Sequence, residues 1–350
     1  MYRVAATLVA LLLTLTAGTT ACGGDAPRRG TPSVGLVVTD QAGTPDDLGL
    51  GYAAGVDRVG GVDSIVTGPP AADGRRQVKM FAALRKRARA GMAVETLSPG
   101  LFARPMAAAV DDGVPVMSVD TVPDHSARVR LYVGNDDYAL GTMLADRIVQ
   151  RIPDGSSATV VLGTSEPGAR ALDARARGLR ARLAAEHPGL TVLGPYRTGR
   201  NAGANRKAWE ALVAAHPAAL AFLGTGENDG INLAAIRRRT HGLWLAGAYD
   251  LNPESLTALR QGELVALVSP EHYLTGMIAG QLQARAARHT TPLPTGWIVT
   301  PGDVVTTANV AEYEERQASA ASKKAWAQPR ADAFLKDLGA HTRPLSDARQ

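Results

Sequence analysis

Cysteine is nearly absent from this sequence, because Cys22 is the only one in 350 residues. A single thiol excludes an internal disulfide, a Cys-x-x-Cys redox pair and a cysteine-based zinc site. Long apolar runs are also few: no segment after the N-terminal leader reaches the roughly 18 apolar residues of a spanning helix. The rest of the chain has the composition of a soluble globular protein. These features predict a chain that is exported rather than threaded through a membrane.

The chain has only a small excess of positive charge, with a formal net charge of +5. Its two short basic runs, "LRKRAR" and "IRRRTH", lie in or at the end of segments with helical periodicity. Runs of this kind are more often solvated helix faces than nucleic-acid surfaces. No nucleic-acid partner is therefore expected.

The first 21 residues have the pattern of a secretory signal peptide. Arg3 precedes the apolar run "VAATLVALLLTLTAG", which has signal-peptide length and is too short to span a membrane. Small residues directly precede Cys22, an arrangement that resembles a bacterial lipobox. The sequence thus predicts that Cys22 carries a lipid anchor, and ordinary signal cleavage beside an incidental cysteine is the alternative. Residues 22–32 are rich in Gly, Pro and Arg and are expected to form a flexible tether.

From Ser33 onward, short apolar runs with many β-branched residues alternate with amphipathic stretches. The run "VGLVVT" is typical of a strand, and in residues 75–91 the apolar Val78, Phe81 and Leu84 share one helical face. Regular alternation of this kind predicts parallel sheets covered by helices on both faces. The units are too many for one open sheet, so the predicted fold class is α/β with two doubly wound, Rossmann-like lobes.

Polar residues follow most of the predicted strands. In open parallel sheets the ligand site lies at the carboxyl ends of the strands. A ring of carboxylates and amides at those ends suits a ligand with many hydroxyl groups, although any single Asp or Asn there could instead cap a helix. The residues concerned are Thr39, Asp40, Asp120, Asn135, Asp136, Thr164, Ser165, Glu227, Asn228, Asp229, Asp250, Pro270 and Glu271.

Four segments, in this order, carry a resemblance to a known family: "MAAAVDDGVPVMSVD", "VGNDDYALGTMLADRI", "AYDLNPESLTALRQGEL" and "VVTTANVAEY". Together they resemble the type I periplasmic binding proteins, specifically the ribose-binding-like substrate-binding lipoproteins of ABC transporters. The resemblance covers roughly residues 33–313. It implies two lobes joined by three hinge crossovers, near Asn135, Pro270 and Gly302. The implied division is 33–135 plus 271–302 for the N-terminal lobe, 136–270 plus 303–313 for the C-terminal lobe, and 314–350 for a helical or disordered tail.

The resemblance also implies a set of ligand-binding residues. It places Asp120, Asn135, Asn228 and Asp250 at ligand-contacting positions, and Asp229 is a neighbouring candidate. Arg175 and Glu271 are two further candidates. Arg175, in "RARGL", matches an arginine three residues before a glycine that recurs in the family. The ligand-gripping arginine of ribose binders lies two residues earlier, where this chain has Asp173, and a surface helix residue is the alternative for Arg175. Glu271 is adjacent to Pro270, which stands where the family often has Gln at the second hinge.

The function implied is capture of a small polar ligand, a sugar or sugar-like molecule, between the lobes. A lipid-anchored monomer on the outer face of the cell membrane would deliver it to an ABC transporter permease, without cofactor or metal. The segment after the first strand has Pro45 but none of the stacking aromatics of sugar binders. A nucleoside, a cationic ligand or a sugar-derived signal therefore stays open, as does a receptor that feeds a signalling protein.

Signatures of catalysis are missing. The seven His show no HExxH spacing, "GTSEPG" is not a GxSxG elbow, and no P-loop is present. A glycoside-acting enzyme remains the alternative, because acidic strand ends could supply two opposed carboxylates. A DNA-binding repressor of the same fold would need a helix-turn-helix where this chain has its leader. The chain is predicted not to be an enzyme.

Overall fold

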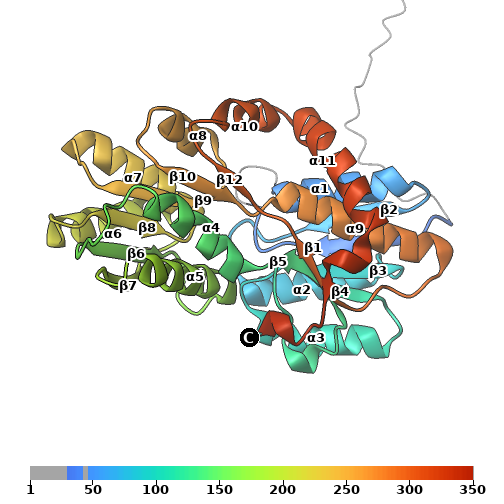
Figure 1. Ribbon diagram of the computed structural model, residues 1–350. Coiled ribbons are helices and arrows are strands. Elements are labelled where there is room, and N and C mark those ends of the chain that lie inside the picture. The colour runs from blue at the N-terminus through green and yellow to red at the C-terminus, as the bar shows by residue number, and fades with distance from the viewer. Residues whose placement is uncertain (1–29, 42–45, 350) are drawn as a thin grey trace, which may run out of the picture.

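The computed structural model describes residues 30–41 and 46–349. The predicted signal peptide, Cys22 and Pro45 lie outside the described residues. The described chain forms two α/β lobes side by side, and the carboxyl-terminal segment runs over both of them (Figure 1). No helix among the described residues is long and apolar enough to cross a membrane.

The N-terminal lobe is built on a seven-stranded sheet in the order β13-β11-β5-β4-β3-β1-β2. All of its strand pairs are parallel except that between β11 and β13. The strands are β1 (Ser33–Val37), β2 (Asp63–Thr67), β3 (Gly91–Val94), β4 (Val116–Val119), β5 (Leu131–Asn135), β11 (Gly296–Thr300) and β13 (Thr342–Arg343). The helices are α1 (Asp47–Val59), α2 (Gly74–Arg85), α3 (Pro99–Asp111), α9 (His272–His289) and α11 (Ala320–Lys336), with short 3-10 turns η1 (His125–Ala127), η2 (Leu338–His341) and η3 (Asp347–Arg349).

The C-terminal lobe is built on a six-stranded sheet in the order β12-β10-β9-β8-β6-β7. Only β12 is antiparallel to its neighbour. The strands are β6 (Thr159–Thr164), β7 (Thr191–Arg197), β8 (Ala221–Gly224), β9 (Leu245–Tyr249), β10 (Ala266–Ser269) and β12 (Asp303–Val305). The helices are α4 (Asp137–Val149), α5 (Arg170–Glu186), α6 (Ala202–Ala215), α7 (Glu227–Thr240), α8 (Pro253–Arg260) and α10 (Val310–Gln317).

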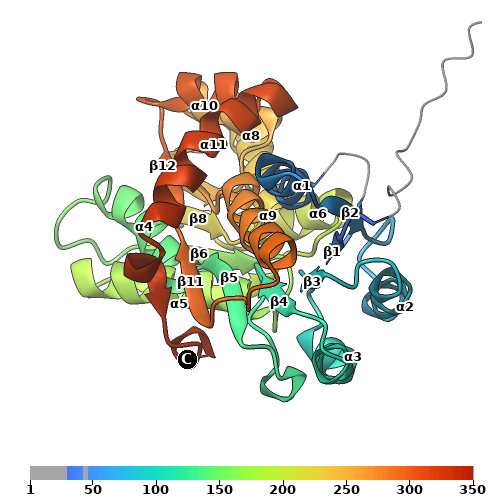
Figure 2. The same ribbon diagram turned by 90° about the vertical axis from the view of Figure 1, so that its right-hand side faces the viewer.

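Side chains of the central strands alternate between two cores, as the period of a strand requires. In β1, Val34 and Leu36 pack into the core under α1 and α9, whereas Val37 packs into the core under α2 and α3. Figure 2 shows α1 and α9 together, away from α2 and α3. In the C-terminal lobe, Val160 packs towards α4 and α5, and Val161 packs towards α6 and α7. The predicted fold class, two doubly wound α/β lobes, is confirmed.

Helices α1 and α9 approach each other closely because glycines line their contact. A Cβ atom added at Gly51 would lie 2.0 Å from the carbonyl oxygen of Tyr273. One added at Gly276 would lie 2.1 Å from that of Leu48. Real side chains essentially never reach such distances, so the helix backbones can meet only where no Cβ is present. This contact places the start of α9, and with it a hinge, against α1.

The substitution Gly276→Ala is expected to lower the free energy of unfolding by about 1–3 kcal/mol, the usual cost of overpacking a core. Alanine favours a helix over glycine by about 1 kcal/mol, which works in the opposite direction. Gly100→Ala in α3 is the matched control, because nothing lies within 4 Å of its added Cβ and no loss is expected. Urea unfolding measures both variants. A Gly276→Ala protein as stable as wild type would contradict the close contact.

The chain passes between the two sheets more often than the resemblance implies. It crosses after β5, after β10 and between β11 and β12, and then a fourth time after α10. Helix α10 buries Val310 and Tyr313 in the C-terminal core, whereas α11 buries Ala327 and Phe334 in the N-terminal core. Strand β13 then pairs with β11. The segment predicted as a helical or disordered tail, 314–350, contacts both lobes within its described part, because Gln317 donates to the carbonyl oxygen of Leu251 and Phe334 lies in the N-terminal core (Figure 1).

Candidate functional site

The carboxyl ends of the two sheets face each other across the lobe junction, and His272 connects them. Asp120 follows β4 in the N-terminal lobe, and Asp250 follows β9 in the C-terminal lobe. The Nδ1 atom of His272 lies 3.5 Å from Oδ2 of Asp120, and its Nε2 atom lies 3.4 Å from Oδ1 of Asp250. Two predicted site residues from different lobes therefore converge on one imidazole at the hinge.

Local backbone geometry sets the direction of these side chains. Asp120 and Asp250 have φ angles of 52° and 68°, in the left-handed region. Aspartate is one of the few residues other than glycine that adopts this conformation. The chain therefore turns sharply directly after each strand, and the carboxylate is carried towards the other lobe.

The ionisable groups at the lobe junction shift one another's pKa values. Burial alone would lower the pKa of His272, but Asp120 and Asp250 raise it to about 10. Burial would raise the pKa of Asp250, yet the His272 imidazolium keeps it below its usual range. Burial raises the pKa of Asp120 to about 6, with His272 opposing the shift. The imidazole therefore lies between two carboxylates that both favour its protonated form.

The sequence prediction missed His272, although it directly follows a predicted strand end and Glu271. It also missed Glu95, which follows β3. Both oxygens of Glu95 accept hydrogen bonds from Thr39, one from the backbone N–H and one from the hydroxyl. Burial, with the nearby Asp46 and Asp120, raises the pKa of Glu95 to about 8. Its place directly after the apolar residues Met92, Ala93 and Val94 was the available signal.

Arg175 is not a surface helix residue, since only 5% of it is exposed. Its Nε donates to Oδ1 of Asp137 at 2.9 Å, and Nη1 donates to the carbonyl oxygen of Thr225 at 3.2 Å. Its guanidinium also lies 4.7 Å above the ring centre of Tyr249. Burial alone would lower the pKa of Arg175, but Asp137 and Asp250 keep it above its ordinary value. Arg175 therefore carries a fixed charge inside the C-terminal lobe, close to Asp250.

Asn135 connects two crossovers instead of standing free at a strand end. Its Nδ2 donates to the carbonyl oxygens of Thr300 and Pro301, both at 3.0 Å. These bonds join the end of β5 to the end of β11, where both chains leave the N-terminal lobe. Its Oδ1 is buried and has no hydrogen-bond partner among the described residues. The Nδ2 group of Asn135 thus joins the two crossovers, whereas its Oδ1 accepts no hydrogen bond from the described residues.

The structure does not bring Asp229 to the junction. The residue is wholly buried, and its Oδ1 accepts hydrogen bonds from Thr198, Asn205 and Trp209. Its Oδ2 accepts the backbone N–H of Gly226 at 2.9 Å. A carboxylate bonded in this way organises the start of α7, and its hydrogen bonds are made within the C-terminal lobe.

Asn228 lies one residue earlier and is half-buried. Its Nδ2 donates to the carbonyl oxygen of Arg200 at 2.8 Å. The Arg200 guanidinium reaches across the junction to Asp40, with 3.5 Å between Nη2 and Oδ2. Asn228 therefore supports a loop that contacts the N-terminal lobe.

Glu271 forms a buried ion pair with an arginine of α10. It is 3% exposed, and its two carboxylate oxygens lie 2.6 and 2.7 Å from Nη1 of Arg316 on α10. The guanidinium of Arg316 also lies 4.6 Å from the ring centre of Tyr313 and 4.4 Å from that of Trp326. Glu271 is therefore engaged with the carboxyl-terminal helices, and its neighbour His272 takes the place at the junction.

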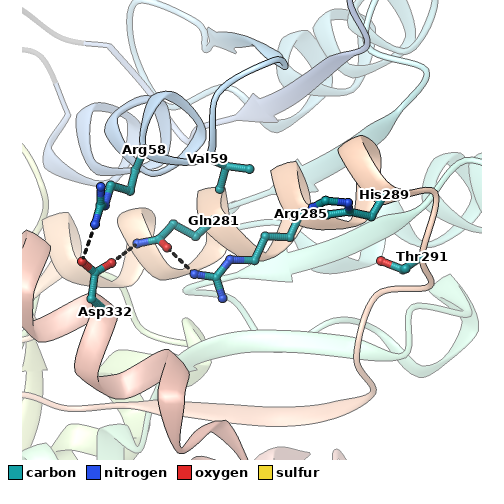
Figure 3. A pocket seen from close by; sticks show the side chains of 7 residues that line it. All are labelled: Arg58, Val59, Gln281, Arg285, His289, Thr291 and Asp332. Atoms are coloured by element: carbon teal, nitrogen blue, oxygen red, sulfur yellow. Dashed lines mark hydrogen bonds and ion pairs between the residues drawn. The ribbon is translucent and has the colours of Figure 1, made fainter.

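A pocket of about 400 Å³ lies elsewhere, on the outer side of the N-terminal lobe (Figure 3). Arg58 and Gln281 both contact Asp332 there, and Arg285 donates to the amide oxygen of Gln281 at 2.8 Å. Its polar groups are thus largely paired with one another, between α1, α9 and α11. It is distant in the fold from the strand ends and plays no part in the site described above.

Comparison with known proteins agrees with this architecture. Residues 54–291 match the family described as "Periplasmic binding protein domain". The xylose/arabinose-binding protein XylF of Sulfolobus acidocaldarius is 24% identical over 231 residues, which are 61% of this chain and 55% of that protein. The chain thus spans about half the length of this curated relative.

Solved structures show the same fold. A solute-binding protein from Burkholderia graminis, in complex with D-arabinose, has a TM-score of 0.72 at 21% identity and covers 81% of this chain and 97% of its own. GanP, a glucose-galactose binding protein from Geobacillus stearothermophilus, has a TM-score of 0.69 at 20% identity, with 79% and 98% covered. Family match, two-lobed topology and facing strand ends agree with one another: this chain belongs to the periplasmic binding proteins, of type I.

Proposed function

We propose that this protein binds a small hydroxyl-rich ligand of the sugar class between its lobes and presents it to an ABC importer outside the cytoplasmic membrane. One observation carries the proposal: Asp120 and Asp250, one from each lobe, converge on His272 at a hinge. Carboxylates accept hydrogen bonds from sugar hydroxyls, and they are oriented here before a ligand arrives. The xylose/arabinose and D-arabinose binders among the similar proteins support the sugar class.

The mechanism follows from the position of these groups. A ligand that contacts both Asp120 and Asp250 interacts with the closed arrangement more than with an open one, so its binding free energy favours closure. The crossovers next to Asn135 and Glu271 are the places where the backbone would rotate. The closed molecule would then be the form that a permease recognises. A lipid on Cys22 would keep the receptor beside its transporter, since a diacylated cysteine anchors more firmly than one acyl chain.

The ligand is expected to be held mainly by polar groups. Tyr249, the ring that directly precedes Asp250 in sequence, is buried inside its lobe. It cannot offer the flat face on which a sugar ring stacks. Hydrogen bonds to hydroxyl groups therefore have to supply the orientation of the ligand, which favours a molecule with many of them.

The thermal unfolding midpoint of the chain from residue 23 onward, measured against a panel of compounds, tests the proposal. The panel contains D-arabinose, D-xylose, D-glucose, D-galactose, polyols and nucleosides. A ligand of the folded state adds about 2.7 kcal/mol of stability at about a hundredfold excess over its Kd. We expect an upward shift with at least one sugar. A shift with nucleosides alone would replace the proposal with the nucleoside-binding alternative, and no shift with any compound would contradict the sugar class.

A further inference from the structure

His272 is the cation on which the two converging carboxylates depend. Among the described residues, no Lys or Arg side chain lies within ion-pair distance of Asp120 or Asp250. The neighbouring cations are already paired with other acids: Arg175 with Asp137, and Arg200 with Asp40. Without the imidazolium, Asp120 and Asp250 would face each other across the junction with no cation in ion-pair contact, and Arg175 and Arg200 would act on them only from a greater distance.

The residue that precedes His272 fixes its position. It is the first residue of α9, and the preceding Glu271 has a φ of 59° and is bound by Arg316. A positive charge is unfavourable at a helix N-terminus, because the helix dipole is positive there. The charge of His272 is thus not explained by its helix, and the two carboxylates stabilise it. Asp46 and Glu227 also act on it electrostatically.

The other acids at the junction are satisfied within the protein. Asp46 accepts the backbone N–H groups of Leu48 and Gly49 at the start of α1, and Glu95 accepts both donors of Thr39. A ligand therefore need not bring a charge of its own. The pair of Asp120 and Asp250 has a cation in contact with it only while His272 is an imidazolium.

Resting on the proposed function, we infer that His272 sets the charge class of the ligand. Its imidazolium occupies the place between Asp120 and Asp250 that the ammonium group of an amino sugar would otherwise take. The junction is therefore selective for uncharged hydroxyl-rich ligands over their amine-bearing analogues. His272 is a specificity-determining residue that acts through its two carboxylate partners.

The test compares matched pairs of ligands by calorimetry at neutral pH: D-galactose with D-galactosamine, and D-glucose with D-glucosamine. The ratio of Kd for the amine to Kd for the neutral sugar is expected to fall at least tenfold in His272→Gln, which removes the positive charge and keeps a hydrogen-bonding side chain. His125→Gln is the control, because His125 is 83% exposed and pairs only with Asp124, so its ratio should stay unchanged. An unchanged ratio in His272→Gln overturns the inference but leaves the proposed function intact. A wild-type protein that binds none of the four compounds and shows no thermal shift with any sugar of the panel overturns both.

A second measurement needs no ligand. An NMR pH titration assigns the His272 imidazole by its loss in His272→Gln. We expect no titration of this imidazole near 6.5, the ordinary value, and a return towards that value in Asp250→Asn. An imidazole that titrates in its ordinary range in the wild-type protein overturns the inference, whatever the ligand proves to be.

Discussion

Replacement of Arg316 by methionine is expected to lower the free energy of unfolding by about 3–5 kcal/mol. Methionine keeps much of the apolar stem of the side chain but removes the charge. Glu271 would then be a buried carboxylate, 3% exposed, without its cation. The loss of a single partner is costly for this reason, since the remaining charge stays in a medium that solvates it poorly. Denaturant unfolding measures the change.

The double variant Glu271→Gln with Arg316→Met is the control for this experiment. It removes both charges, so most of the stability lost in Arg316→Met should return. Burial already raises the pKa of Glu271 above its usual range, with Arg316 opposing, so a neutral side chain is tolerated better there than an unpaired charge. A single variant within about 0.5 kcal/mol of wild type, the range of ordinary surface substitutions, would show that the pair contributes little.

This ion pair concerns more than local stability because of what it joins. Glu271 stands at a crossover, Arg316 belongs to α10 in the C-terminal lobe, and Trp326 belongs to α11 against the N-terminal lobe. Trp326 lies between two guanidinium groups, those of Arg316 and Arg330, at 4.4 and 3.9 Å from its ring centre. The carboxyl-terminal helices thus contact the hinge at Glu271, next to the residue that contacts Asp120 and Asp250.

The second large effect is expected in ligand binding. Asp250→Ala should raise the Kd for the sugar identified in the thermal panel by roughly 10- to 150-fold. This range corresponds to about 1.5–3 kcal/mol for hydrogen bonds to a charged group. Asp250 is chosen because its pKa is held below the usual range, so that its carboxylate is ionised and a strong acceptor. Calorimetric titration measures the affinity.

Two further variants keep this experiment interpretable. Asp250→Asn preserves a carbonyl oxygen and tolerates the φ of 68°, so an intermediate loss of affinity is expected. Asp111→Ala is the matched control, because Asp111 is exposed on α3, where it pairs with Arg128 away from the strand ends. It should bind like wild type. Unaltered affinity in Asp250→Ala, with the protein folded, would remove Asp250 from the site and with it the converging pair.

The amino-acid sequence by itself determined the fold class and the places where chemistry could occur. The periodicity of apolar residues predicts which face of each helix or strand is buried. The alternation of strands and helices along the chain then predicts two doubly wound lobes. It also placed Asp120 and Asp250 at strand ends, because the carboxyl end of a parallel strand is fixed by the order of elements alone. The lipid anchor at Cys22, the permease and the monomeric state stay predictions.

Only the tertiary structure decided which of the polar residues reach the junction. After a strand ends, one φ angle determines which side chain faces the other lobe: the 59° at Glu271 turns that carboxylate to Arg316 and leaves the junction to His272. Partners separated by dozens of residues decide the rest. Thr198, Asn205 and Trp209 donate hydrogen bonds to the carboxylate of Asp229, and an arginine 45 positions away pairs with Glu271. Periodicity carries no information about such long-range pairs, because charge compensation acts between groups that only packing brings together.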